Sequence, residues 1–218
     1  IVKNGALVRQ HKAIVGKNYR RTPVFSSKIS YLVLNPTWTV PPGIINGDVI
    51  PSVKKDVNYL KNKNIDVYDN TGNIINPNTV DWNNPAAKSY TYRQPAGPAN
   101  ALGAVKFMFP NNFSVYLHDT PSRELFEKTE RSFSSGCLRV QNPLQLAEYF
   151  IGDSVQWNLS KIKKQVESQN TLTIPLSEKP DIYILYWTAW TDDKGLIQFR
   201  KDIYSRDQKV SKALAEHL

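Results

Sequence analysis

The sequence contains one cysteine, Cys137, and three histidines, and none of its 218 positions begins a run of 18 apolar residues. A single cysteine excludes an intramolecular disulfide and a zinc site built from cysteine pairs. The histidines have no carboxylates at ligand spacing, so we expect no metal site and no cofactor. The lack of a long apolar run excludes a membrane-spanning helix of the usual length. Apolar residues still make up 40% of the chain, which is enough for a packed core.

Positive charge exceeds negative charge, with 28 Lys and Arg against 19 Asp and Glu, a formal net charge of +9. This excess predicts attraction to anionic partners such as an acidic polymer. The lysines are spread along the chain, and no dense basic run is interleaved with aromatic residues, so we expect no nucleic-acid partner. A lysine-rich, solvated surface is the alternative explanation of the charge.

The chain begins at Ile1 with a strand-like pattern and without a signal-like apolar segment. We therefore expect a piece of a longer precursor, whose signal or membrane anchor lies outside this sequence.

Strand-like alternation of apolar residues occupies three parts of the chain, which predicts a β-rich α+β domain. The predicted strands lie within residues 6–34, in 104–110 and 113–119, and in 171–175, 181–193 and 195–204, with a hairpin turn at 191–195.

Short helices are expected between these strands. Asp48 is predicted to cap one helix, Thr120 to cap another that starts at Pro121, and Asn142 to cap a third that runs from Pro143 to Gly152. A fourth is expected to open at Ser160.

Residues 36–95 differ in character, since they are rich in Pro, Gly and Asn. We interpret them as an inserted cap carried by a main domain of residues 1–35 and 96–205, followed by a C-terminal tail at 206–218. The name "cap" is used below for residues 36–95.

The stretch "FSSGCLRV" at 133–140 places the only cysteine after Gly136. A cysteine nucleophile requires a base, an accessible position and donors for an oxyanion. Gly136 allows close backbone approach, and the N–H groups of Ser135 to Cys137 are candidates for an oxyanion nest. The alternative is that Cys137 is a small buried apolar residue.

His118 is the best candidate for the base, because it ends a predicted strand and is followed by a loop. Tyr116 lies two positions before His118 in the same predicted strand, so the two side chains are expected on the same face. His11 lies in a turn-like segment where we expect it to be solvated, and His217 belongs to the terminal "AEHL". The alternative for His118 is a structural histidine bonded to the next helix cap.

The text "HDT" at 118–120 and "SSGCLRV" at 134–140 resembles the signature of the L,D-transpeptidase (YkuD-type) catalytic domain, and the likeness extends over nearly the whole chain. "VYLHDTP", "FSSGC" and the late "YWTAW" and "QFR" segments resemble most closely the YcbB-like periplasmic enzymes of Gram-negative bacteria. Many family members have a second histidine before the glycine of the cysteine motif. This chain has Ser135 there, so His118 is left as the only base.

The resemblance implies a mixed β-sheet or sandwich core with short helices and an inserted cap subdomain. It also implies 3–3 crosslinking of peptidoglycan through a thioester on Cys137, with release of D-Ala from a tetrapeptide donor. His118 would move the protons, and the backbone carbonyl of Asp119 would orient the imidazole. The Asp119 side chain is alternatively a cap for the following helix.

Further roles are implied for residues around the cysteine. Tyr116 could direct its hydroxyl to the thioester oxygen or pack across strands. Arg139 could hold the loop or meet a substrate carboxylate. Ser134 and Ser135 would shape the loop, and Trp38 of the cap would lean over the stem peptide.

The resemblance further implies stem peptides with a diaminopimelate acceptor as substrates, carbapenems as acylating inhibitors, and a periplasmic, wall-associated location. We expect a monomer that works with periplasmic wall-synthesis enzymes. Two other functions remain open at this point. Water could replace the amine, giving an L,D-carboxypeptidase or a wall amidase, or the fold could serve as a non-catalytic wall-binding module.

Overall fold

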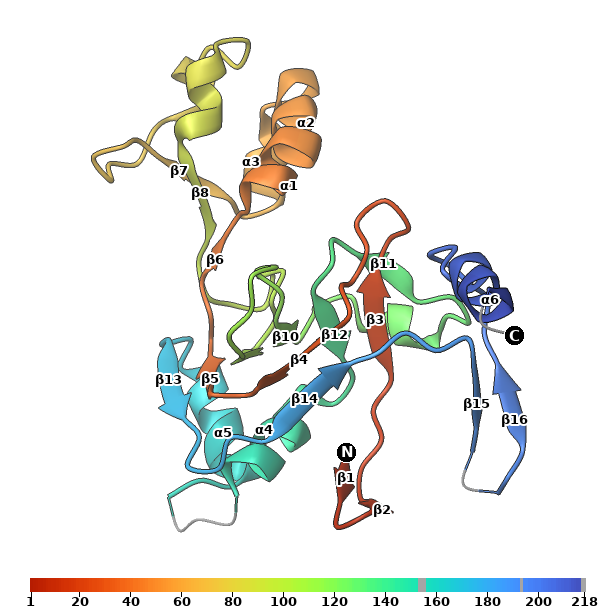
Figure 1. Ribbon diagram of the computed structural model, residues 1–218. Coiled ribbons are helices and arrows are strands. Elements are labelled where there is room, and N and C mark those ends of the chain that lie inside the picture. Colours follow the sequence, from red (N-terminus) through yellow and green to blue (C-terminus); the bar gives the residue numbers. More distant parts are fainter. Residues whose placement is uncertain (153–155, 193, 217–218) are drawn as a thin grey trace.

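The computed structural model describes residues 1–152, 156–192 and 194–216, and its main feature is a mixed sheet of seven strands. Figure 1 shows the sheet below the cap. The strands lie in the order β11 (Ser132–Ser134), β3 (Ala13–Gly16), β12 (Leu138–Val140), β10 (Leu117–His118), β9 (Val105–Met108), β5 (Tyr31–Leu34) and β13 (Leu172–Pro175).

One face of this sheet forms the main hydrophobic core. Leu117 pairs with Phe107 on one side and with Leu138 on the other, and residues opposite each other share a face. Phe107 is fully buried and meets Phe150 edge to face at 5.8 Å between ring centroids. The elements that cover this face are α4 (Pro143–Ile151), α5 (Leu159–Glu167) and the ribbon of β4 (Phe25–Lys28) and β14 (Asp181–Ile184).

The opposite face carries the polar residues of interest. His118 pairs with Lys106 of β9 and with Arg139 of β12, so these three side chains leave the sheet on the same side. The alternation along β10 therefore sends Leu117 into the core and His118 away from it.

The cap contains a second hydrophobic core and its own small sheet (upper part of Figure 1). Its strands are β6 (Trp38–Thr39), β8 (Thr91–Gln94) and β7 (Asp66–Tyr68). Tyr92 and Leu60 are buried at its centre. Its helical segments are α1 (Pro42–Ile44), η1 (Ile45–Val49, a π-helix), α2 (Ile50–Lys55), α3 (Asn58–Asn62), η2 (Pro77–Thr79) and η3 (Pro85–Ser89). The division into domains stays a prediction.

The first cap helix starts earlier than its apolar periodicity suggested. Pro41, not Asp48, is the N-cap, and Asp48 lies inside the helical segment, so the predicted Asp48 cap is wrong. The Asp48 carboxylate instead forms an ion pair with Arg20 of the main domain.

Apolar residues at helical spacing predict one helix with Val49, Val53, Val57 and Leu60 on its buried face. Val49, Val53 and Leu60 are buried and Val57 is partly buried, but these residues are divided among η1, α2 and α3, so the single helix is wrong.

Another predicted helix start is also wrong. The segment after Thr120 is a 3-10 helix, η4 (Arg123–Glu127), because the Thr120 hydroxyl accepts the Ser122 N–H and closes a turn before the helix. The helix expected to open at Ser160 exists as α5 and begins one residue earlier, at Leu159, where the Asn158 side chain caps it by accepting the Lys161 N–H.

Asn142 does precede α4, as predicted, but it adopts a left-handed conformation and makes no side-chain cap bond. Gly152 ends that helix with φ of +81°, as expected for a residue without Cβ.

The predicted strands exist but are shorter than their patterns. The pattern at 181–193 is divided between β14 and β15 (Ala189–Thr191), and β15 pairs with β16 (Ile197–Phe199). Asp193 of the predicted turn lies outside the described residues.

The two ends of the described chain add small elements. The tail contains an unpredicted helix, α6 (Asp207–Ala215), and β1 (Val2–Lys3) pairs with β2 (Ala6–Leu7) at the start. The β-rich α+β class is confirmed, and no helix among the described residues is long and apolar enough to cross a bilayer.

Candidate active site

Cys137 lies in the tight loop between β11 and β12, half-buried at the wall of a cavity of about 570 Å³. The cavity lies between the cap and the loops of the main sheet, because Trp38 and Ile44 line it together with Cys137. Seven of the nine predicted site residues line this cavity: Trp38, Tyr116, His118, Ser134, Ser135, Cys137 and Arg139.

Hydrogen bonds inside the loop fix the position of the thiol. The buried Ser134 hydroxyl donates to the Cys137 carbonyl at 2.6 Å and accepts the Gly136 N–H at 3.2 Å. Gly136 has φ of +116°, a conformation that favours glycine. Its carbonyl accepts from the Thr22 hydroxyl at 2.9 Å. Since the Gly136 amide is engaged within the loop, the amides of Ser135 and Cys137 are left as candidate oxyanion donors.

His118 is buried, with 5% of its surface exposed, and its Nδ1 lies 2.5 Å from the carbonyl oxygen of Asp119. A carbonyl can only accept, so Nδ1 carries the hydrogen and Nε2 keeps a free lone pair. The side chain thus presents an acceptor nitrogen in the cavity that also contains Cys137.

The electrostatics of the pair favour two neutral groups at rest. Burial, helped by the Arg139 charge, lowers the pKa of His118 to about 3. Burial also raises the pKa of the Cys137 thiol, although hydrogen bonds from Tyr116 and the Arg139 charge oppose this rise. The thiol itself contacts the Ser114 carbonyl at 3.8 Å and shares the cavity with the imidazole. A neutral imidazole in the same cavity as a protonated thiol can act as a general base when a substrate arrives.

Arg139 is a partly buried cation next to both groups. Burial lowers its pKa, while the nearby Cys137 and Glu124 raise it. Its buried Nε has no hydrogen-bond partner among the residues that the structure describes. Since Nε itself is buried, it is a site for an internal water rather than a donor open to a ligand in the cavity.

Tyr116 connects the thiol, the base and the cap. Its ring lies 5.7 Å from that of His118, and its hydroxyl interacts with Cys137 and with Trp38. Burial, with the Cys137 charge as a further cause, raises the pKa of the Tyr116 hydroxyl, which remains a donor at neutral pH. The Lys106 ammonium, which the sequence did not single out, also lies over this ring, 6.0 Å from its centre.

Arg20 is a site residue that sequence reasoning missed. One guanidinium nitrogen is 2.5 Å from Asp48 Oδ2 and 3.0 Å from the Ser135 hydroxyl, so Arg20 bridges the cap and the cysteine loop. The sequence separates Arg20 from Ser135 by 115 positions, and no local signal connects them.

Two predicted positions need correction. The Asp119 carboxylate does not cap the following helix, because it accepts the Ala104 N–H at 2.9 Å. His11 is half-buried rather than solvated, since its Nδ1 bonds the Gln141 carbonyl at 2.8 Å and its Nε2 is buried. His217 lies outside the described residues.

In the described part of the chain, no group of three or more His, Cys, Asp and Glu is arranged to hold a metal ion.

Comparison with known proteins gives two findings. The family described as "YkuD: L,D-transpeptidase catalytic domain" matches residues 1–156. A protein of Haemophilus influenzae named "Putative L,D-transpeptidase" is 37% identical over 212 residues, which is 97% of this chain. The chain spans less than half of that relative, 43% of its length.

Proposed function

This chain belongs to the L,D-transpeptidase catalytic-domain family, and on that premise we propose that it forms 3–3 crosslinks in peptidoglycan through an acyl-enzyme on Cys137. The observation that carries the proposal is the shared cavity. It contains the only cysteine of the chain and a neutral histidine whose Nδ1 is held by a backbone carbonyl. This arrangement follows the general logic of nucleophile, base and orienting group.

In the first half-reaction, the donor is a tetrapeptide stem that ends in D-Ala. Cys137 Sγ attacks the carbonyl carbon that links the third residue to D-Ala, and His118 Nε2 takes the thiol proton. The resulting oxyanion accepts hydrogen bonds from the Cys137 amide and the Tyr116 hydroxyl. Collapse breaks the C–N bond, and the imidazolium gives its proton to the leaving amine of D-Ala. A thioester on Cys137 remains.

In the second half-reaction, the side-chain amine of a diaminopimelate residue on another stem attacks the thioester carbon. His118 takes a proton from the attacking amine and returns it to the departing sulfur. The products are the 3–3 crosslink and the free thiol, so the enzyme is restored without a cofactor.

The charges around the cavity support an anionic substrate. Lys17, Arg20, Arg21 and Arg139 line the cavity, and Asp48, which pairs with Arg20, is the one carboxylate among its described lining residues. The excess is positive, and stem peptides carry free carboxylates. We further propose that Arg139, which lines the cavity, meets such a carboxylate, and that Trp38 covers the bound peptide from the cap.

The wider setting follows from the same substrate. We also propose a periplasmic location near other wall-synthesis enzymes, because that is where such a substrate would be met. A carbapenem offers a strained carbonyl to the same thiol, and we propose that it acylates Cys137.

Product analysis tests the reaction. We would incubate the protein with purified disaccharide-tetrapeptide and identify the muropeptides by mass spectrometry. The proposal expects a crosslinked dimer and free D-Ala from the wild type, and neither product from Cys137→Ala. Tripeptide monomer without dimer would instead show an L,D-carboxypeptidase. No turnover, together with salt-sensitive binding to sacculi, would favour a wall-binding module.

A further inference from the structure

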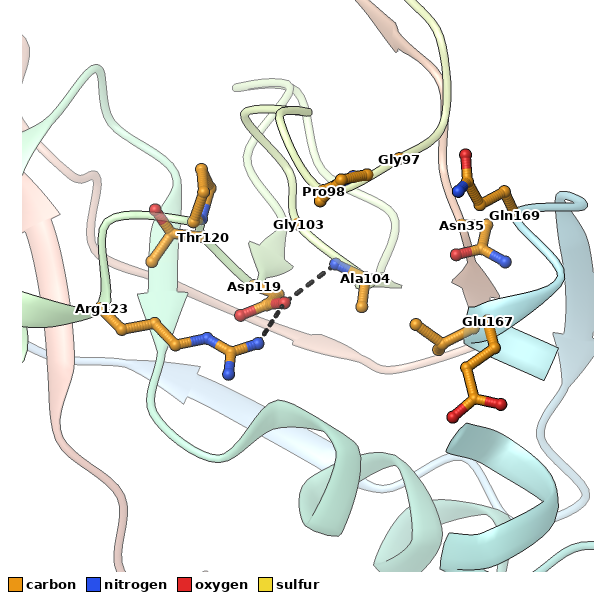
Figure 2. A pocket seen from close by; sticks show the side chains of 12 residues that line it. Asn35, Gly97, Pro98, Gly103, Ala104, Asp119, Thr120, Arg123, Glu167 and Gln169 are labelled. Atoms are coloured by element: carbon orange, nitrogen blue, oxygen red, sulfur yellow. Dashed lines mark hydrogen bonds and ion pairs between the residues drawn. The ribbon is translucent and has the colours of Figure 1, made fainter. Parts of the chain in front are cut away.

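The side chain of Asp119 is buried and lines a different cavity from the one that contains Cys137 and His118. Only 2% of its surface is exposed. Its Oδ2 accepts the Ala104 N–H at 2.9 Å and lies 3.5 Å from the exposed Arg123 guanidinium, as Figure 2 shows. Its Oδ1 is buried and has no hydrogen-bond partner among the described residues. A buried carboxylate with so few partners is costly, which suggests a purpose other than stability.

Gly103 makes the room for this carboxylate. Its φ is +60°, and a Cβ at this position would overlap Asp119 Oδ2, Cγ and Cβ. The turn before β9 and the side chain of Asp119 therefore fit only because residue 103 has no side chain. The sequence offers no sign of this pairing, since 16 positions separate the two residues (119 − 103).

The backbone of Asp119 is anchored to the same segment. Its N–H donates to the Val105 carbonyl at 2.9 Å, next to the Ala104 amide that its side chain accepts. Two neighbouring residues, Ala104 at the end of the turn and Val105 at the start of β9, thus hold the side chain and the backbone of Asp119. With these fixed, the Asp119 carbonyl points to His118 Nδ1 at 2.5 Å.

We propose that Asp119, through its carboxylate, is a positioning residue that aims its own carbonyl and so holds His118 in the tautomer with Nε2 free. The inference rests on the proposed function, in which His118 moves the protons. Without the carboxylate, the 118–120 segment loses its attachment to Ala104, and the imidazole can rotate or exchange tautomers. The proton transfers then depend on the tautomer with Nε2 free, which only a fraction of the molecules would have at any time.

Nitrogen-15 NMR of the histidines, at neutral pH and without substrate, tests this directly. Wild type is expected to show His118 protonated at Nδ1 and not at Nε2. Asp119→Ala is expected to show a mixture of tautomers. Gly103→Ala, which pushes the carboxylate out of its place, is expected to show the same. His118→Gln assigns the signal, and His11 serves as an unchanged internal reference.

Kinetics supply the second readout. Asp119→Ala and Gly103→Ala are expected to lower kcat roughly 10-fold or more and to change KM by less than about 3-fold. Asp119→Asn keeps an oxygen that can accept the Ala104 N–H, so it should lower kcat less than Asp119→Ala does. Gly72→Ala is the matched control, because Gly72 also has positive φ, +89°, but no atom lies within 4 Å of its would-be Cβ. It should keep wild-type kcat.

The outcomes separate the two proposals. If the wild type forms no crosslink, the proposed function fails, while the tautomer measurement still tests Asp119. A wild-type tautomer and kcat within about 2-fold of wild type in Asp119→Ala would overturn the positioning role, even if the variant unfolds at a lower temperature. If Gly103→Ala does not fold, Asp119→Asn and Asp119→Ala decide the question alone.

Discussion

At the scale of single residues, Arg139 acts on both reacting groups. It lies opposite His118 in the sheet, and its charge lowers the pKa of His118 and of the Cys137 thiol. Burial is the main cause of the lowered pKa of His118, and the cation adds to it, while it counters the rise that burial causes in the pKa of the thiol.

Replacement of Arg139 by glutamine is expected to raise the pKa of His118 and the pKa of Cys137. The positive charge that disfavours the imidazolium and favours the thiolate is then absent. Alkylation of Cys137 by iodoacetamide reports on the thiolate, and no other cysteine exists to confuse the signal. Arg139→Gln should therefore react more slowly at pH about 7.5 and show a higher apparent pKa than the wild type. Arg200→Gln, on the exposed segment after β16, should behave like the wild type. An unchanged pH profile in Arg139→Gln would refute this electrostatic role.

At the scale of elements, Thr22 and Tyr204 fasten the cysteine loop from behind. The buried Thr22 hydroxyl accepts the Gly16 N–H and donates to the Gly136 carbonyl, both at 2.9 Å. Tyr204 donates to the Gly16 carbonyl at 2.7 Å and accepts the Thr22 N–H. The end of β3, the cysteine loop and the C-terminal region thus meet at one buried hydrogen-bonded network.

Thr22→Val has nearly the same shape but leaves two buried backbone groups without a partner. We expect it to lower the free energy of unfolding by about 1–3 kcal/mol and to slow acylation of Cys137. Urea unfolding and intact-mass kinetics measure the two effects. Thr173→Val, an exposed substitution in β13, should change stability by less than about 0.5 kcal/mol. Equal stability of the two variants would contradict the role given to Thr22.

Local patterns in the sequence predicted the elements more reliably than their ends. Alternation of apolar residues found β5 and β9, and the Pro143 start and Gly152 stop found α4. Asp48 was misplaced because its partner, Arg20, lies 28 positions away and is reached only in the folded chain.

The same distinction holds for the site. A motif revealed Cys137 and His118, which each stand in a short recognisable segment. Thr22, Arg20 and Gly103 have no such segment, because their partners, Gly136, Ser135 and Asp119, are brought to them by the sheet.

At the scale of the whole molecule, the neutral His118 makes stability depend on pH. Its pKa is about 3 when folded, against an ordinary value of 6.5 in an unfolded chain. Below 6.5 the unfolded chain binds a proton that the folded chain does not, so stability is lost as pH falls from 6.5 toward 3 and is unaffected above this window.

We therefore expect His118→Gln to be less sensitive to acid than the wild type. The difference between the two proteins in unfolding free energy should change by up to about 1.4 kcal/mol per pH unit below pH 6. Urea unfolding at several pH values between 7.5 and 4.5 measures it. Parallel stability curves for the two proteins would show that His118 is not held neutral in the folded state.

The central claim is that Cys137 is an acyl-accepting nucleophile with His118 as its base. Intact-mass spectrometry after incubation with a carbapenem tests it most directly, on wild type, Cys137→Ala and His118→Gln. We expect one adduct on the wild type, none on Cys137→Ala and a rate lowered roughly 100-fold or more in His118→Gln. An adduct that persists in Cys137→Ala, or no adduct on the folded wild type, would contradict it.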